Sequence, residues 1–212
     1  MLKLFVDTVV WRYWFTLKAK KPLPRSNQEE DAKAFDTIFD KASSREQGFI
    51  LLYNDCVETE LPDEYRYNHA ICFEKIKSLN FMEKICIPLS RADGTHKLDG
   101  SIKAGGKFGG SLREILSISG HSHEIAFRNA KPKLKRKENP AHTEPRKKEF
   151  DVEHLESALE AEADFFLTAD YKLMGRLIQA KKEYPTNKVI HLALKICFRP
   201  VDAVTEIETR GH

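Results

Sequence analysis

The chain has 212 residues, of which 41% are hydrophobic and 32% are charged. This composition is typical of a folded chain with its own core, and it excludes collagen-like and wholly disordered proteins. The net charge is only +3, but residues 131–149 contain eight Lys or Arg and three Glu, a local charge of +5 that leaves −2 for the rest.

The first 90 residues alternate between apolar runs and helical periodicity. Ser26 and Glu29 have the spacing of a capping box at the start of a helix, and Pro62 must interrupt any helix that follows the second apolar run. The aromatic run 11–15 is predicted to pack a helix against the sheet or to line a dimer surface. The expected elements are, in order, a strand at 2–6, a helix at about 27–45, a strand at 49–53, helical structure at 55–80 and a short apolar run at 85–87.

Periodicity fades from about residue 90 to 149, where glycines and the basic segment predict a loop-rich insertion. Order is expected to return at Asp151, which we predict to open a helix. The later elements are expected to be a strand at 165–167, a helix around 173–178 and a strand at 194–198 stopped by Pro200. Strands that alternate with helices predict a single α/β domain over 1–212, with a largely parallel sheet.

The cysteines and the N-terminal residues indicate the cellular compartment in which the protein is expected. The four cysteines include no CxxC pair, which argues against a zinc ribbon or a dense disulfide framework and favours reduced thiols. The apolar start of the chain is interrupted by Asp7 and Arg12, well short of the ~20 residues that a membrane span needs. We therefore expect a cytoplasmic protein without a membrane partner.

Two of the predicted strands end in an aspartate, Asp7 and Asp170. Ligands of open parallel sheets bind beyond the carboxyl ends of the strands, so these two carboxylates are expected to converge. Glu60 follows the second strand and Asp151 precedes the strand that ends near Asp170, so both could join them. Crowded carboxylates need a cation, and oxygen ligands without a His or Cys cluster favour Mg²⁺ or Mn²⁺.

These residues resemble a PIN domain, the nuclease module of VapC-type toxins and related RNases. The resemblance lies in Asp7, in the Glu60-Leu61 pair, and above all in the block DVEHLESALEAEADFFLTAD at 151–170. It implies a three-layer α/β/α sandwich, with Asp7, Glu60, Asp151 and Asp170 in the acidic positions and Thr168 in the hydroxyl position. Glu58 is the alternative to Glu60; two residues apart on a helix turn by ~200°, so only one can face the same ion.

The resemblance further implies an endoribonuclease that cleaves single-stranded RNA with a metal-activated water, using Mg²⁺ or Mn²⁺. An antitoxin-like protein and a second copy of the chain are the candidate protein partners. The alternatives are a PIN-like RNA-binding or assembly module without turnover, and DNA cleavage by the same site.

The basic segment is not part of this resemblance. Its prolines predict an extended strand suited to a phosphate backbone. The predicted RNA-binding residues are Lys131, Lys133, Lys135, Arg136, Lys137, Arg146, Lys147 and Lys148.

Overall fold

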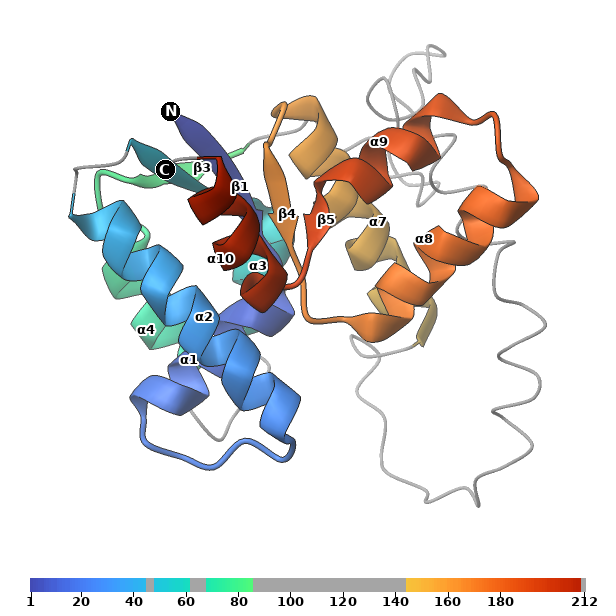
Figure 1. Ribbon diagram of the computed structural model, residues 1–212. Coiled ribbons are helices and arrows are strands. Elements are labelled where there is room, and N and C mark those ends of the chain that lie inside the picture. The colour runs from blue at the N-terminus through green and yellow to red at the C-terminus, as the bar shows by residue number, and fades with distance from the viewer. Residues whose placement is uncertain (45–47, 62–67, 86–143, 211–212) are drawn as a thin grey trace, which may run out of the picture. The chain divides into compact units, whose positions relative to one another are not determined.

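The computed structural model describes residues 1–44, 48–61, 68–85 and 144–210 (Figure 1). Within these residues, five strands form one sheet in the order β3-β2-β1-β4-β5, and every neighbouring pair is parallel. The strands are β1 (Leu2–Val6), β2 (Phe49–Tyr53), β3 (Met82–Lys84), β4 (Phe165–Leu167) and β5 (Cys197–Phe198). The helices are α1 (Thr8–Lys18), α2 (Ser26–Ser43), α3 (Asp55–Glu60), α4 (His69–Ile76), α7 (Glu144–Glu160), α8 (Tyr171–Glu183), α9 (Lys188–Ile196) and α10 (Pro200–Thr209).

The predicted α/β class with a parallel sheet is confirmed. Side chains of β1 alternate between the two faces of the sheet, so that Leu4 and Val6 join the core under the helices while Phe5 points to the other side. Phe5 and Phe166 contact each other with ring centroids 5.8 Å apart, and both are fully buried. Both faces of the sheet are therefore covered, as all-parallel sheets require.

The chain divides into two compact units. The first comprises Met1–Ile87, Ser157–Asp170 and Ile196–His212, and it contains the whole sheet with α1 to α4 and α10. The second comprises Pro88–Glu156 and Tyr171–Lys195, and it contains α8 and most of α7 and α9. The predicted insertion at about 90–149 lies almost entirely outside the described residues. None of the helices described has both the length and the apolar character needed to cross a membrane.

An aromatic cluster joins α1 to α2 and α4 in the first unit. Trp11 is fully buried at its centre. Its ring lies 5.0 Å from that of Phe35 on α2 and 5.3 Å from that of Phe73 on α4, both in edge-to-face geometry. The aromatic run 11–15 therefore packs α1 into the core, as one of its two predicted roles required.

The start of α2 differs from the sequence prediction. The helix was expected to begin after a Ser26–Glu29 capping box, but Ser26 is already helical and Arg25 is the N-cap, with no side-chain hydrogen bond to the helix. The helix itself forms where expected, because Phe35 and Ile38 place its apolar face on the core. The prediction of the capping box was wrong, and that of the helix was right.

Strand β3 comprises Met82–Lys84, directly before the apolar run at 85–87, of which residues 86 and 87 lie outside the described residues. Two further boundaries were predicted wrongly. Residues 194–196 belong to α9, so β5 is limited to Cys197–Phe198, and Pro200 opens α10 as well as ending the strand. Helix α7 begins at Glu144 instead of Asp151, with Pro145 in its first turn, where a proline removes no helical hydrogen bond.

Candidate functional site

The carboxyl ends of β1 and β4 bring Asp7 and Thr168 together. The two strands pair with Val6 opposite Leu167, and the Asp7 amide donates to the Leu167 carbonyl over 3.0 Å. The Thr168 hydroxyl donates to Oδ2 of Asp7 over 2.6 Å, and it accepts from the Asp170 amide over 3.0 Å. Thr168 is fully buried and Asp7 is 5% exposed. One hydroxyl thus binds the carboxylate of Asp7 and the backbone amide of Asp170 at the carboxyl end of the sheet.

Asp7 is the N-cap residue of α1, but its side chain does not cap the helix. A capping aspartate accepts hydrogen bonds from the first amides of the helix. Asp7 makes no such bond and instead accepts from Thr168. Helix capping therefore does not account for the aspartate at this position.

Replacing Thr168 by Val is expected to lower the free energy of unfolding by about 1–3 kcal/mol, because the buried Asp7 carboxylate loses a donor and the Asp170 amide loses an acceptor. Thr168→Ser keeps the hydroxyl and should retain most of the stability. Urea unfolding of both variants without metal measures the difference. Equal stability of Thr168→Val and wild type would mean that the hydroxyl is not holding the two aspartates.

Glu60 lies at the end of the short helix α3, and one of its carboxylate oxygens is within 4.8 Å of one of Asp7. The neighbouring helix α1 supports this position, because Nη2 of Arg12 donates to the Glu60 carbonyl over 3.0 Å. A cation is favourable there, since the last carbonyls of a helix have no partner within it and carry partial negative charge. The sequence predicted that Asp7 and Asp170 converge and that Glu60 could join them; in the first unit it is the Glu60 carboxylate that lies near Asp7.

The other end of α3 is anchored by Asn54, directly after β2. Its Oδ1 accepts from the Val57 amide over 3.2 Å and thereby caps the helix. Its Nδ2 donates to the hydroxyl of Ser157 in the last turns of α7, over 2.8 Å. Both residues are buried, so this bond fixes α3 from inside the first unit.

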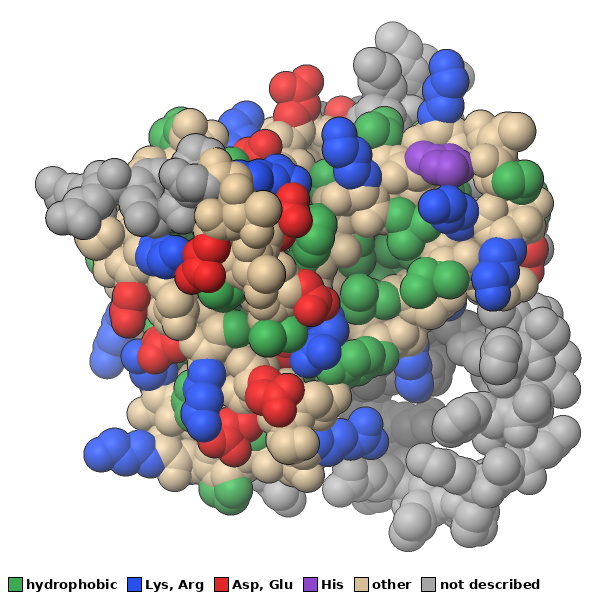
Figure 2. Space-filling model, viewed as in Figure 1, with side chains coloured by type: hydrophobic (Ala, Val, Ile, Leu, Met, Phe, Trp, Pro, Cys, Tyr) green, Lys and Arg blue, Asp and Glu red, His purple; other side chains and the backbone are tan. Residues whose placement is uncertain are grey.

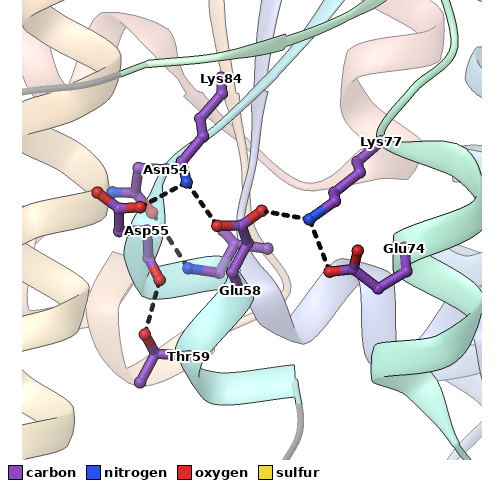
Figure 3. Close-up of polar contacts among 8 residues, drawn as sticks. Asn54, Asp55, Glu58, Thr59, Glu74, Lys77 and Lys84 are labelled. Carbon is purple, nitrogen blue, oxygen red and sulfur yellow. Dashed lines mark hydrogen bonds and ion pairs between the residues drawn. The ribbon is translucent and has the colours of Figure 1, made fainter.

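Glu58, the alternative to Glu60, takes part in an ion-pair network instead (Figure 3). Its carboxylate binds Nζ of Lys84 at 2.6 Å and Nζ of Lys77 at 3.1 Å. Lys84 also binds Asp55 at 2.6 Å, and Lys77 also binds Glu74 at 2.7 Å. These hydrogen bonds raise the pKa of both lysines, so each stays charged at neutral pH. The network ties α3 to β3 and α4 and compensates the charge of Glu58.

The negative charges of Asp7 and Asp170 both affect the thiol of Cys197. Burial raises the pKa of the Cys197 thiol to about 12, and the negative charges of Asp7 and Asp170 add to this effect. The pKa of Tyr13 on α1 is likewise raised by burial, with a smaller contribution from Asp170. Cys197 is therefore a neutral thiol at physiological pH, and the electrostatic field around it is negative.

Asp151 belongs to the second unit and does not open a helix. It lies in the middle of α7 and forms an ion pair with Arg176 of α8. His154, one turn further along α7, is 1% exposed, so it is not a surface histidine. A role for Asp151 beside the other acids stays a prediction from the sequence.

The predicted RNA-binding residues are placed only in part. Lys131, Lys133, Lys135, Arg136 and Lys137 lie outside the described residues. Arg146, Lys147 and Lys148 fall in the first turns of α7, so the backbone there is helical and the extended conformation expected for this part of the segment was wrong.

Sequence reasoning missed Arg12 and the Asn54–Ser157 pair. Asn54 carried a usable signal, because an asparagine directly after an apolar run is a common N-cap. Arg12 and Ser157 carried none, since their partners lie 48 and 103 residues away in the chain.

Comparison with known proteins gives no relative: no protein-family model, no curated protein and no solved structure matches the chain.

Proposed function

We propose that the chain is a divalent-metal-dependent endoribonuclease of the PIN type. The observation that carries this proposal is the approach of the Asp7 and Glu60 carboxylates to within 4.8 Å at the carboxyl edge of a parallel sheet, with Asp7 buried. Two carboxylates this close disfavour each other's ionised form, and a bound cation relieves that repulsion. The carboxyl edge is also where open parallel sheets bind their ligands.

The residues present fit Mg²⁺ or Mn²⁺. Asp7 and Glu60 offer carboxylate oxygens within 4.8 Å of each other, and such oxygens are the ligands that these hard cations prefer. Asp170 is proposed as a further ligand on the PIN resemblance. When bound, such a cation would lower the pKa of a water and neutralise charge on a phosphodiester. Thr168 fixes the orientation of Asp7 by its bond to Oδ2, and Arg12 holds the backbone of Glu60. Asp151 is proposed as the fourth acid on the PIN resemblance alone.

The substrate proposal is single-stranded RNA. It rests on the PIN resemblance and on the basic segment 131–149, which carries a local charge of +5 in a chain of net charge +3. The same resemblance carries the proposals of an antitoxin-like partner and of a homodimer. A chain that binds RNA without cleaving it would instead be a PIN-like binding module.

The test of the proposed function compares Glu60→Gln with Glu58→Gln. Cleavage of a panel of single-stranded RNA and DNA oligonucleotides is measured with Mn²⁺ and with EDTA. Glu60→Gln is expected to lower Mn²⁺ affinity and cleavage by more than ~10-fold, because it removes a ligand. Glu58→Gln should change unfolding by less than ~1 kcal/mol and leave cleavage intact, since it only weakens a partly exposed ion-pair network.

Three outcomes separate the alternatives. RNA binding by the wild type without cleavage in Mn²⁺ would support the binding module. Cleavage of DNA in preference to RNA would overturn the substrate assignment but keep the site. Loss of cleavage in Glu58→Gln and not in Glu60→Gln would exchange the roles of the two glutamates.

A further inference from the structure

Helices α8 and α9 form a second basic region, and it lies within the described residues. The segment 171–195 contains six Lys or Arg and one Glu, a local charge of +5. Together with residues 131–149 it leaves a net charge of −7 for the remaining chain. Positive charge is thus concentrated in two segments, of which only the α8–α9 segment has described side chains.

The exposed face of α9 combines charge with apolar surface. Four exposed residues share one face of the helix, because they lie three, four and seven residues after the first of them: Lys188, His191, Leu192 and Lys195. Ile190 and Ala193 are fully buried on the other side. Figure 2 shows Lys and Arg side chains with apolar side chains between them over α8 and α9.

Helix α8 presents a similar face. Its exposed residues along one side lie four, seven and eleven residues after the first of them: Tyr171, Gly175, Ile178 and Lys182. Tyr171 is 44% exposed and Ile178 is 50% exposed. Leu173, Leu177 and Ala180 on the opposite side are fully buried. The exposed face therefore offers an aromatic ring, an aliphatic side chain and a cation in one row.

Four of the five lysines of this region form no ion pair among the described residues. Lys181, Lys182, Lys188 and Lys195 are exposed and form no ion pair there. By contrast, Arg176 on another side of α8 pairs with Asp151. Lysines that stabilise their own fold are usually placed near carboxylates, as Lys77 and Lys84 are. These four are available to an anionic partner.

Gly175 is a separate indication of a partner. It lies in the interior of α8, where glycine destabilises a helix relative to alanine because it loses more backbone freedom on folding. Among the described residues, no atom outside the backbone of the helix and the two chain neighbours lies within 4 Å of the position that a Cβ would take, so nothing described there requires a glycine. A glycine on an exposed helix face permits close approach of a ligand to the backbone.

We propose that the exposed face of α8 and α9 is a contact surface for single-stranded RNA, which rests on the proposed function for the identity of the nucleic acid. The four lysines contact phosphates, Tyr171 stacks on a base, and Gly175 lets the strand approach α8. A basic surface with an exposed aromatic ring is the combination that binds single strands without sequence preference. Tyr171 directly follows Asp170 in the chain.

The test measures RNA binding without cleavage. Fluorescence anisotropy of a labelled 12-nucleotide single-stranded RNA is recorded in EDTA over a range of KCl concentrations. The variant K181Q/K182Q/K188Q/K195Q should bind more weakly, and its log–log salt slope should fall by ~0.7 for each lost phosphate contact, up to ~2.8 for four. The control K20Q/R25Q/K33Q/K75Q removes four exposed cations of the first unit, and its slope should change much less.

Gly175→Ala provides a second, independent readout. It should raise the melting temperature by about 1–4 °C, because alanine is the better helix former and its methyl group meets no described atom outside the backbone of the helix and the two chain neighbours. It should at the same time weaken RNA binding, since the added methyl group blocks close approach. A variant that is more stable and binds less well cannot be explained by unfolding.

Several outcomes would contradict the proposed surface. One is an unchanged salt slope in the α8–α9 variant, and another is an equal loss of RNA affinity in both quadruple variants. Unchanged RNA affinity in Gly175→Ala would also contradict it, and so would a monomer–dimer shift without any change in RNA affinity, which would assign the face to a second copy. Because the assay needs no catalysis, a wild type that binds through this face but never cleaves would refute only the nuclease.

Discussion

Replacing Asp7 by Asn is expected to reduce Mn²⁺-dependent cleavage by ~100-fold or more while the protein stays folded. Loss of a residue that merely supports a ligand already lowers metal affinity or activity by 10–100-fold, and Asp7 is proposed as a ligand itself. The fold should tolerate the change, because an asparagine oxygen can still accept from Thr168. The unfolding free energy without metal should hold or rise, since one of two carboxylates within 4.8 Å becomes neutral.

Metal-dependent stabilisation gives the same prediction a readout without substrate. Mn²⁺ should raise the melting temperature of the wild type, because only the folded chain assembles the ligands, and it should do so much less for Asp7→Asn. Asp164→Asn is the matched control. Asp164 precedes β4 at the opposite edge of the sheet and accepts from the Lys3 amide over 2.9 Å. Wild-type cleavage by Asp7→Asn, or equal loss in Asp164→Asn, would refute the assignment.

The three inner strands could be predicted from the sequence because both faces of the sheet are buried. Residues 2–6, 49–53 and 165–167 are nearly continuous apolar runs, and β1, β2 and β4 occupy those positions. The same reasoning predicted that Asp7 and Asp170 lie at one end of the sheet, because parallel strands place their carboxyl ends together, and it allowed Glu60 to join them.

The edge strands and the start of α7 could not be predicted in this way. β3 and β5 each have only one neighbouring strand and are three and two residues long, so they carry little apolar signal. Leu194 and Ile196 alternate with Lys195, as apolar and polar residues do in a strand, yet all three belong to α9. Apart from Pro145, the first seven residues of α7 include one apolar residue, Phe150. The hydrophobic periodicity therefore begins later than the helix.

The supports of the site were also beyond the sequence. Nothing in the residues around Arg12 indicates that it reaches the Glu60 carbonyl, or that Glu58 faces two lysines. These contacts depend on how α1, α3, α4 and β3 pack, which local spacing does not encode. Local patterns therefore predict which acids follow the carboxyl ends of the strands. Tertiary contacts determine the hydrogen bonds and ion pairs that each acid makes.

Replacing Trp11 by Ala is expected to lower the free energy of unfolding by about 3–5 kcal/mol, the largest effect of any single substitution proposed for this chain. The ring is fully buried and contacts aromatic rings of three helices, with Phe35 and Phe73 nearest. Its removal leaves a cavity lined by rings that cannot easily close it, because each is fixed by other neighbours.

Trp11→Phe tests whether ring packing or the indole itself is responsible. The indole Nε1 is buried and has no hydrogen-bond partner within the described residues, so phenylalanine removes an unsatisfied donor along with part of the volume. Its loss of stability should therefore be well below that of Trp11→Ala. Lys18→Ala, at the exposed end of α1, is the control for helix propensity and should change stability by less than ~1 kcal/mol.

The same experiment connects the core to the proposed site. α1 begins directly after Asp7 and carries Arg12, so a loosened Trp11 cluster should also release the Glu60 carbonyl. Urea unfolding with and without Mn²⁺ measures both effects, and we expect Trp11→Ala to lose part of the Mn²⁺ stabilisation that Trp11→Phe keeps. A loss below ~1 kcal/mol in Trp11→Ala would contradict the packing of α1 at the centre of the aromatic core. Full Mn²⁺ stabilisation in that variant would mean that Asp7 and Glu60 are held together independently of α1.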